Sequence, residues 1–422
     1  MLRLETAHFT NFRCFADLQI ALEPDLTVLF AENAGGKTAL LTGLAMGLGL
    51  LQPDRPSALR LDPVRDTRRT GPIGERKEPG GQCELAWTAT VGDHPGISWT
   101  ASASPTSGMR KLRRKKVSAA IEAVWSPGKR WPLIAYYGTD RLAPANGFWF
   151  LPDPAKGPTK SSADPHHRWQ GYTDCLDPSA SDSPLLNWLR NETFGDLSRT
   201  ERGKAKRHLS RAVFDAFMHA TPGVEEAYYD PALGGPIIRF QSGEETPWTE
   251  LSDGYHVFLG LVGDIARRAA ILNEKDGAEA PQKAEGVVLI DEIDLHLHPR
   301  WQRRVLAGLR DAFPKLQFIV TTHSPQVLSS AQNRQVRRLS NHAVVEGDIH
   351  VEGRDTNSIL REEMDTDERD PRGVQALRAL YDALDRGKTA EAKSQLATLL
   401  DKWGTLDPDL IRAQSFIDEE DE

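Results

Sequence analysis

The chain has 422 residues, of which 27% are charged and 39% are hydrophobic, and its formal net charge is −8. This is the composition of an ordinary globular protein, and the length predicts two or three domains at roughly 150 residues per domain. The sequence contains no apolar run of about 18 residues that would cross a bilayer, and its N-terminus lacks the apolar core of a signal peptide. Three widely spaced cysteines fit free thiols in a reducing compartment, so we expect a cytoplasmic protein without a membrane segment. The negative net charge argues against a uniformly basic surface for nucleic acid, which leaves local basic segments for such contact.

The N-terminal part joins strands, a glycine turn and a helix. Alternating apolar and polar residues predict a small antiparallel set of strands that leads into a buried strand at Leu26–Phe30. The next residues, Ala31–Thr38, have the sequence AENAGGKT and precede the apolar helix ALLTGLAMGLGLL. A helix N-terminus after a glycine turn offers free N–H groups and a positive dipole end to phosphate oxygens. The segment therefore predicts an ATP-binding phosphate loop, in which Lys37 bridges the β and γ phosphates and Thr38 places its hydroxyl on Mg²⁺.

Two alanines depart from the strict phosphate-loop pattern. The pattern has glycine where this sequence has Ala31, and related ATPases usually have a second glycine in place of Ala34. A left-handed backbone at Ala34 would cost roughly 1 kcal/mol, because its Cβ crowds the backbone. We therefore expect slow hydrolysis and an unchanged fold.

The residues from about 53 to 132 contain strand-like pieces and a basic run at Arg110–Lys116. This run is either a solvated loop or a contact for the backbone of DNA or RNA, and both interpretations stay open. A further buried strand, Trp131–Tyr137, ends in a polar loop. In that loop Arg141 faces either a phosphate group or an acidic side chain.

The central part predicts an insertion and a helical lobe. Leu151–Ser183 is rich in Pro, Ser, Asp and Gly, which is typical of a surface insertion. Leu185–Arg190 and Glu201–Ala220 have helical patterns, and strand signals follow at Tyr228–Phe240 and Thr246–Glu250.

The segment Leu251–Tyr255, LSDGY, opens a long amphipathic helix. Ser252 and Asp253 are favourable N-cap residues, so one interpretation is a capped helix that binds nothing. In the other interpretation, this helix N-terminus holds the γ-phosphate of a nucleotide on a second molecule, through Ser252 and the backbone of Gly254.

The segment around which the other elements are expected to be arranged is a strand–helix–strand unit between Gly286 and Leu328. Val287–Ile290 is an apolar run typical of a strand buried on both faces of a parallel sheet. An expected helix at Trp301–Phe313 leads to a second apolar strand, Phe318–Val320, which ends in TTHS.

Two carboxylates, Asp291 and Glu292, directly follow the first of these strands. Open α/β sheets bind ligands at the carboxyl ends of their strands. A buried carboxylate there needs a cation or a donor, and Mg²⁺ with a nucleotide would supply it. His296 and His298 follow in the next loop, where they either form a metal pair or support a dimer contact.

The C-terminal part has a different pattern. Val374–Leu384 and Ala390–Leu400 predict two helices turned at Gly387, and a third begins near Pro408. These helices either pack on the chain's own ATPase core or form a docking platform for a partner. The acidic tail Asp418–Glu422 is expected to be solvated.

Taken together, residues 26–50 and 248–328 resemble the ABC-type, SMC-like ATPases, in the branch that includes RecF and the OLD-like defence ATPases. The motifs AYYGT, LSDGY, DEIDLHLHP and GRDTNSIL resemble those of the PtuA subfamily from Septu and retron-linked antiphage systems. The resemblance assigns Asp291 as the Walker B ligand of Mg²⁺, Glu292 as the catalytic residue and His323 as the switch histidine. It assigns nucleotide binding to the Walker A residues Asn33, Gly35, Gly36, Lys37 and Thr38 and to the signature residues Ser252, Asp253 and Gly254.

The resemblance also implies an α/β fold: a P-loop ABC-type ATPase head with a mixed sheet and flanking helices, an antiparallel β subdomain, a helical lobe and a C-terminal helical extension. Expected domains are an ATPase lobe at 1–150, a loop-rich and helical insertion at 151–225, a second ATPase lobe at 226–350 and a C-terminal docking region at 351–422.

The same resemblance implies partners. ATP would be sandwiched between two copies in a homodimer or higher oligomer, a separate HNH nuclease would be held or regulated, and a retron-linked system would add a reverse transcriptase and its RNA. Two alternatives stay open: a RecF-like DNA-binding repair ATPase, and a nucleotide-bound scaffold that scarcely hydrolyses ATP.

Overall fold

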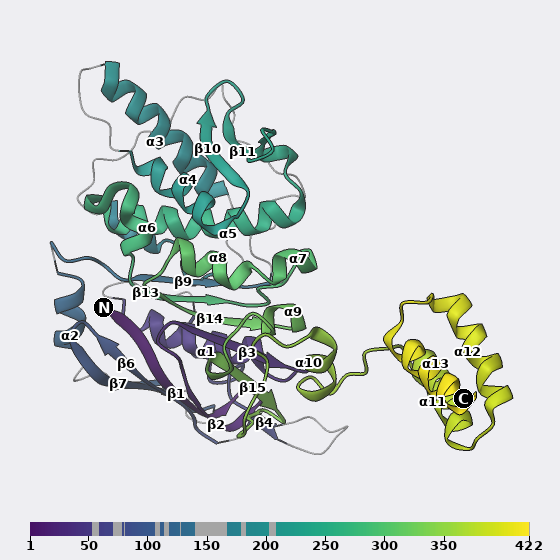
Figure 1. Ribbon diagram of the computed structural model, residues 1–422. Coiled ribbons are helices and arrows are strands. Elements are labelled where there is room, and N and C mark those ends of the chain that lie inside the picture. Colours follow the sequence, from purple (N-terminus) through teal and green to yellow (C-terminus); the bar gives the residue numbers. More distant parts are fainter. Residues whose placement is uncertain are drawn as a thin grey trace. The chain divides into compact units, whose positions relative to one another are not determined.

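Figure 1 shows the computed structural model of the chain, which divides into two compact units, Met1–Arg354 and Asp355–Glu422. The structure describes residues 1–52, 59–70, 78–79, 81–105, 110–113, 118–126, 128–139, 167–178, 183–201 and 208–421. Within these ranges, no helix is both long enough and apolar enough to cross a membrane.

A six-stranded sheet forms the centre of the first unit, with the strand order β16-β15-β3-β14-β13-β9. Its five strands from β15 to β9 are parallel, and the short edge strand β16 is antiparallel to β15. The three central strands and β9 are buried along their whole length, as their unbroken apolar runs predict. The strands are β3 (Leu26–Ala31), β9 (Leu133–Tyr137), β13 (Gly286–Ile290), β14 (Leu316–Thr322), β15 (Val336–Ser340) and β16 (Ala343–Val344).

A five-stranded antiparallel sheet, with the order β2-β1-β6-β7-β8, packs against helix α1 (Lys37–Gly49). Two glycines one turn apart on α1 make room for aromatic rings: a Cβ at Gly43 would lie 2.5 Å from Phe9, and one at Gly47 would lie 2.5 Å from Trp87. The indole of Trp87 donates to the carbonyl of Gly43 at 3.1 Å. The helix behind the phosphate loop is thus fixed by the antiparallel sheet. The strands are β1 (Leu2–Phe12), β2 (Phe15–Ala21), β6 (Cys83–Val91), β7 (His94–Ala103) and β8 (Arg110–Arg113).

The helical lobe is built around α5 (Asp253–Leu272), most of whose residues are buried. Helix α4 (Leu209–Ala220) packs against it, and the hairpin of β10 (Val224–Asp230) and β11 (Gly235–Phe240) packs against α4. The other elements of the first unit are β4 (Arg69–Thr70), β5 (Glu78–Pro79), α2 (Ser118–Val124), η2 (His167–Tyr172), α3 (Ser183–Glu201), β12 (Glu245–Pro247), η3 (Trp248–Glu250), η4 (Glu274–Glu279), α6 (Ala280–Lys283), α7 (Pro299–Gln302), α8 (Val305–Ala312), α9 (Pro325–Leu328) and η5 (Asn333–Gln335).

The second unit contains α10 (Thr356–Glu362) and three longer helices, α11 (Pro371–Asp385), α12 (Thr389–Trp403) and α13 (Pro408–Asp421). The three longer helices enclose an apolar core of their own, and α11 and α12 turn at Gly387, where φ is 66°. The core residues are Leu380, Ala383, Leu384, Ala392, Leu396, Leu399, Leu410, Ala413 and Ile417.

The predicted fold class is confirmed, and several expected elements differ in detail. The helix expected at Leu185–Arg190 is part of the longer α3, which also contains Glu201, and the helix expected at Glu201–Ala220 corresponds to α4, which begins at Leu209. The helix expected at Trp301–Phe313 is divided into α7 and α8, because the N–H of Arg304 bonds to the carbonyl of Trp301 and tightens the chain. The strand expected at Thr246–Glu250 stops at Pro247, which has no N–H to continue a ladder. The strand signals at Tyr228–Phe240 belong to a hairpin whose turn follows Asp230.

Two predictions concern residues that the structure does not describe. Arg141 lies outside the described residues, as do the last three residues of the basic run, Arg114–Lys116. The first part of the run, Arg110–Arg113, forms the edge strand β8, and its side chains are outside the described set. Both interpretations of the run therefore stay open.

Candidate functional site

The phosphate loop connects β3 to α1 and uses two left-handed residues, Ala34 with φ 63° and Gly36 with φ 99°. Space also requires the two glycines. A Cβ at Gly35 would lie 2.7 Å from the Cβ of Ala31, and one at Gly36 would lie 2.7 Å from the ring of Phe15. The loop therefore has the tight backbone that the sequence predicts, with one strained alanine in it.

Lys37 folds back over its own loop. Its Nζ donates to the carbonyl oxygens of Ala31 at 3.0 Å and Glu32 at 3.2 Å. Burial lowers the pKa of Lys37, while the nearby carboxylates of Asp291, Glu292 and Asp294 act in the opposite direction. The ammonium group thus lies within the field of the acids that follow β13.

Asp291 is the point at which three parts of the chain meet. Its side chain is buried, with 1% of its surface exposed, and both carboxylate oxygens accept a hydroxyl. Thr38 from α1 donates to Oδ2 at 2.6 Å, and Thr321 from β14 donates to Oδ1 at 2.5 Å. The backbone N–H of Asp291 donates to the carbonyl of Tyr137 on β9 at 2.8 Å. The glycine turn and the strand-end acids, separated by more than 250 positions, are therefore in direct contact.

Glu292 is half-buried and adopts a left-handed backbone with φ 47°. Its N–H donates to the hydroxyl of Thr321 at 2.7 Å, so this one threonine holds both acids. A non-glycine residue in this conformation is strained by about 1–3 kcal/mol, and such strain clusters at functional sites. The geometry gives the two adjacent carboxylates different environments: Asp291 is buried between hydroxyls, and Glu292 is partly exposed.

A third acid, Asp294, was not predicted. Its Oδ1 accepts the hydroxyl of Thr322 at 2.6 Å and the backbone N–H of His323 at 3.3 Å. His323 is half-buried, and the following Ser324 caps α9 through the N–H groups of Gln326 and Val327. The loop that carries His323 is thus fixed to the acids after β13. The third acid in DEID, two residues after Glu292, was the sequence signal for this contact.

The signature segment forms the N-terminus of α5, where Ser252 and Asp253 are exposed and no side-chain cap is made. A Cβ at Gly254 would lie 3.2 Å from the carbonyl oxygen of His296, so this turn packs beside the loop that follows β13. Among the described residues, no hydrogen bond joins these three residues to the phosphate loop. The structure therefore brings Lys37, Thr38, Asp291 and Glu292 together, and it leaves the signature segment on an exposed helix end.

The remaining predicted residues are also located. Asn33 is exposed at the tip of the phosphate loop. His298 caps α7 by accepting the N–H of Arg300 at 3.3 Å, and His296 is exposed with φ 64°. His298 thus has a structural contact within its own loop.

The donor set around Asp291 fits Mg²⁺. This ion prefers oxygen ligands and is usually bound by one or two carboxylates together with substrate phosphates. Thr38 and Asp291 offer a hydroxyl and a carboxylate that already touch each other. These two side chains would hold the ion beside the phosphate loop.

A strand, a tight loop with an inward lysine, a helix and an acid after a second parallel strand of the same sheet define the class of P-loop ATPases. Two family models match the chain: "AAA domain, putative AbiEii toxin, Type IV TA system" over residues 159–329, and "AAA domain" over residues 8–186. The retron Ec83 probable ATPase of Escherichia coli is 34% identical over 435 residues, which cover 88% of this chain and 77% of that protein. The chain therefore belongs to the family of this retron ATPase.

Shorter matches include a Septu protein and a second retron ATPase. The Septu protein PtuA of Bacillus thuringiensis is 30% identical over 160 residues, covering 35% of this chain and 40% of that protein. The retron Vc95 probable ATPase of Vibrio cholerae is 46% identical over 107 residues, covering 25% of this chain and only 20% of that protein. Among solved structures, the SMC head domain from Thermotoga maritima has a TM-score of 0.45 at 13% identity, covering 83% of this chain and all of that one.

Proposed function

We propose that the chain is the ATP-hydrolysing subunit of an antiphage defence complex of the retron or Septu kind. The observation that carries the ATPase proposal is the contact between Thr38 and Asp291 beside the buried Lys37. The relatives named as retron ATPases and as Septu PtuA support the defence role.

Each group has a task in this proposal. The N–H groups of the loop around Gly35 and Gly36, with Asn33 at the tip, cradle the phosphates, and Lys37 leaves its carbonyl contacts to bind the β and γ phosphates. Thr38 and Asp291 hold Mg²⁺, which neutralises charge on the phosphate oxygens when it is bound.

Glu292 is the residue proposed to orient the attacking water. Its carboxylate is partly exposed beside Asp291, and its left-handed backbone is held by Thr321. His323, on the loop fixed by Asp294, is proposed to contact the γ-phosphate. This arrangement transfers the phosphoryl group to water and produces ADP and phosphate.

The second half of the site is proposed to come from another copy of the chain. Ser252, Asp253 and Gly254 occupy an exposed helix N-terminus, where N–H groups and the dipole favour an anion. A second molecule would present this end to the γ-phosphate held at Lys37. The same contact in reverse would form a symmetric dimer with two nucleotides.

Mixing two inactive variants tests this sandwich. Lys37→Ala removes the phosphate-binding ammonium, and Ser252→Arg blocks the exposed helix end, so each variant alone should lose more than about 100-fold in turnover. In a symmetric dimer, a mixed pair contains one site with both substitutions and one intact site. Equal mixing should therefore restore up to about a quarter of wild-type turnover.

The control in this experiment is Leu233→Arg, which places an arginine at a position that is 54% exposed and outside the proposed site, and which should retain most of the activity. Full activity of Ser252→Arg alone, or a mixture as inactive as its components, would contradict the sandwich. DNA-stimulated turnover would favour a repair ATPase instead. Tight ATP binding with almost no phosphate release would favour a scaffold.

The C-terminal unit is proposed to dock the nuclease partner. Residues 355–422 contain 18 acidic and 9 basic residues, a net charge of −9, whereas residues 1–354 contain 42 acidic and 43 basic residues, a net charge of +1. Apolar side chains are also exposed on this unit, with Ile411 at 49% and Phe416 at 48% on α13 and Leu406 at 87% just before it. An acidic surface with apolar anchors suits a basic protein partner such as an HNH nuclease.

Co-expression and co-purification with a candidate HNH nuclease test the docking proposal. The pair Ile411→Ser and Phe416→Ser should reduce the amount of nuclease recovered at least about 10-fold and leave ATP binding unchanged. The matched control is Leu233→Ser, which removes an equally exposed apolar side chain, 54% exposed, from the β10–β11 hairpin. Equal recovery from both variants would contradict this docking site.

A further inference from the structure

A buried group of charges lies in the middle of α5. The carboxylate of Asp264 accepts from Nε of Arg267 at 3.0 Å and from Nη2 at 2.6 Å, and from Nε of Arg268 at 2.7 Å. All three residues are at most 6% exposed. Charges are buried to this extent only when they are paired, so the cluster has a fixed geometry.

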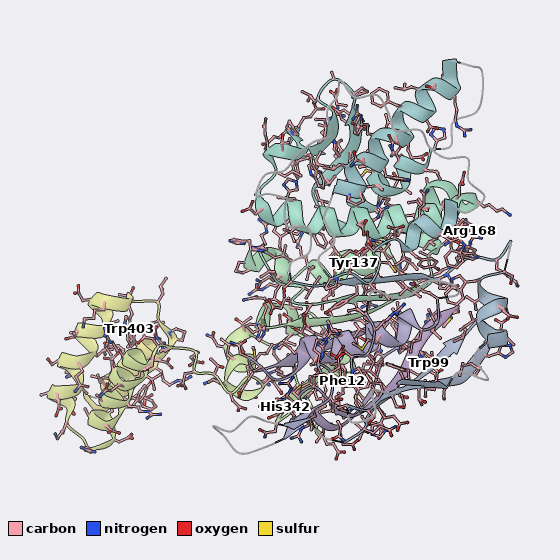
Figure 2. The ribbon with its side chains drawn as sticks, turned by 180° about the vertical axis from the view of Figure 1, so that it is seen from behind. Phe12, Trp99, Tyr137, Arg168, His342 and Trp403 are labelled. Carbon is pink, nitrogen blue, oxygen red and sulfur yellow. The ribbon has the colours of Figure 1, made fainter. Side chains whose placement is uncertain are left out.

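Tyr137 connects this cluster to the strand-end acid. Its hydroxyl donates to Oδ2 of Asp264 at 2.8 Å, and its carbonyl accepts the N–H of Asp291 at 2.8 Å. Figure 2 shows Tyr137 between the teal helix α5 and the strands of the six-stranded sheet. One residue of β9 thus contacts both the helix that carries the signature segment and the acid that contacts Thr38.

The protonation states of the pair suit this hydrogen bond. Burial raises the pKa of Tyr137 well above its ordinary value, which keeps its hydroxyl a donor. Burial also tends to raise the pKa of Asp264, but Arg267 and Arg268 outweigh it and hold that pKa well below its ordinary value. The tyrosine therefore donates to an ionised carboxylate throughout the neutral pH range, which makes the bond stronger than one between neutral groups.

Arg268 also joins the cluster to a segment outside α5. Nη1 of Arg268 donates to the carbonyls of Gly171 and Thr173, each at 2.9 Å. The same segment accepts from β9, because the N–H of Tyr136 bonds to the carbonyl of Cys175 at 2.7 Å. Helix α5 and strand β9 are therefore joined both directly and through residues 171–175. A displacement of β9 along its own axis would pull on Asp264.

We propose that Tyr137 is a positioning residue that couples the Asp291 end of the sheet to the orientation of α5. Asp264 is about 18 Å along the helix from Ser252, so a small rotation at Asp264 moves the exposed signature segment. Nucleotide bound at the phosphate loop beside Thr38 and Asp291 then sets where the segment is presented to the second copy. This inference rests on the proposed function, since it assigns a control of the same two-copy site.

Tyr137→Phe isolates this coupling. The substitution keeps the ring and removes only the hydroxyl, and Asp264 keeps both arginines, so no buried charge is left unpaired. The matched control is Tyr172→Phe. Tyr172 is equally buried, but its hydroxyl donates to the carbonyl of Pro132 at 2.5 Å and makes no bond to Asp264.

The experiment measures five quantities in the full chain with Mg-ATP: the Kd for ATP, the ATP-dependent dimer fraction, kcat, KM, and the amide exchange of residues 253–258. In Tyr137→Phe we expect the Kd and KM within about 2-fold of wild type, kcat lowered about 10-fold, and ATP-induced protection of residues 253–258 reduced. Tyr172→Phe should keep the wild-type kcat and protection. A merely structural role would lower the melting temperature and weaken ATP binding together, without separating kcat from KM.

The possible outcomes distinguish a failure of the coupling through Tyr137 from a failure of the proposed ATPase function. If Tyr137→Phe dimerises, hydrolyses and protects α5 as the wild type does, the coupling is wrong and the proposed ATPase stands. If both tyrosine variants lose kcat equally, the hydroxyl of Tyr137 has no specific role and the coupling is also wrong. If the wild-type chain itself neither binds nor hydrolyses ATP, the proposed function fails and the coupling fails with it.

Discussion

The two halves of the candidate site differ in how much of their bonding is complete within one chain. At the end of β13, each oxygen of Asp291 accepts a threonine hydroxyl, and Thr321 also holds the backbone of Glu292. At the N-terminus of α5, Ser252 and Asp253 are exposed and make no cap with their side chains. The first half is organised by hydrogen bonds within one chain, and the second presents donors outward.

This difference matches the different demands that the proposed function places on the two halves. A metal and triphosphate site needs donors held in place in advance, because reorganisation during the reaction would cost transition-state stabilisation. A surface that must meet another molecule keeps its polar groups in water until contact. The contrast predicts that substitutions at the strand end change chemistry within one chain, whereas substitutions on α5 act through assembly or through the stability of the helix end.

The largest effect is expected from Glu292→Gln. Removing the carboxylate that orients water should lower kcat about 100- to 1,000-fold, since such groups typically contribute 10²–10⁴-fold, while the Kd for ATP changes by less than about 3-fold. Single-turnover phosphate release and calorimetric ATP binding measure the two quantities. A variant that hydrolyses ATP at the wild-type rate would remove Glu292 from its proposed role.

Asp294→Asn is the matched control for this prediction. It also removes one negative charge near Lys37, and its amide oxygen can still accept from Thr322 and from the N–H of His323. We expect it to retain most of the turnover. A loss as large as that of Glu292→Gln would mean that charge around Lys37, and not water orientation, is the sensitive property of the strand end.

The sequence alone is enough to locate the residues at the ends of β3 and β13, because the patterns that mark them are local. A buried apolar strand before AENAGGKT, and another before DEID, place Lys37, Thr38, Asp291 and Glu292 at strand ends without knowledge of the rest of the fold. Their contact follows from parallel strands, and the structure contains it. Their catalytic and binding roles remain predictions.

The contacts that the sequence did not reveal are long-range. Tyr137 appears as one more apolar residue in a buried strand, and Asp264 as a polar residue on an amphipathic helix. Their hydrogen bond joins positions 127 residues apart. The sequence predicts Thr321 in the polar cluster TTHS after Val320, but its bond to Asp291 depends on how β13 and β14 are aligned. Hydrophobic patterning and residue propensity predict which face of a helix or strand is buried. They do not predict which buried polar groups form hydrogen bonds with each other.

The next largest expected effect is a dependence of folding stability on pH, which arises from a histidine in the first turn of α5. His256 lies in the first turn of α5, 1% exposed, with its ring 4.7 Å from that of Trp248. Burial lowers the pKa of His256 from 6.5 to about 4. The unfolded chain then binds a proton near pH 6.5 that the folded chain binds only near pH 4, so stability falls as the pH is lowered through this window. The loss attributable to this group is about 3 kcal/mol.

Urea unfolding between pH 4 and 7 measures this dependence. His256→Leu should flatten the slope between pH 6.5 and 4 relative to the wild type. His94→Gln, which replaces an exposed histidine on β7, should leave the slope unchanged. Identical slopes for the wild type and His256→Leu would show that the helix end carrying the signature segment is not the acid-sensitive part of the molecule.

The smallest effect is expected within the strand-end half, where the phosphate loop itself is strained. Ala34 has φ 63°, a conformation that costs an alanine about 1 kcal/mol more than a glycine, so Ala34→Gly should stabilise the chain by up to this amount or raise ATP affinity a few-fold. The matched control is Ala31→Gly, because Ala31 ends β3 with its Cβ packed in the loop and has no positive φ. It should destabilise the chain slightly, so the two changes should have opposite signs in the melting temperature and in the Kd for ATP. Equal signs would mean that the left-handed turn at Ala34 stores no strain, and that the strand-end half is organised by its threonine hydroxyls alone.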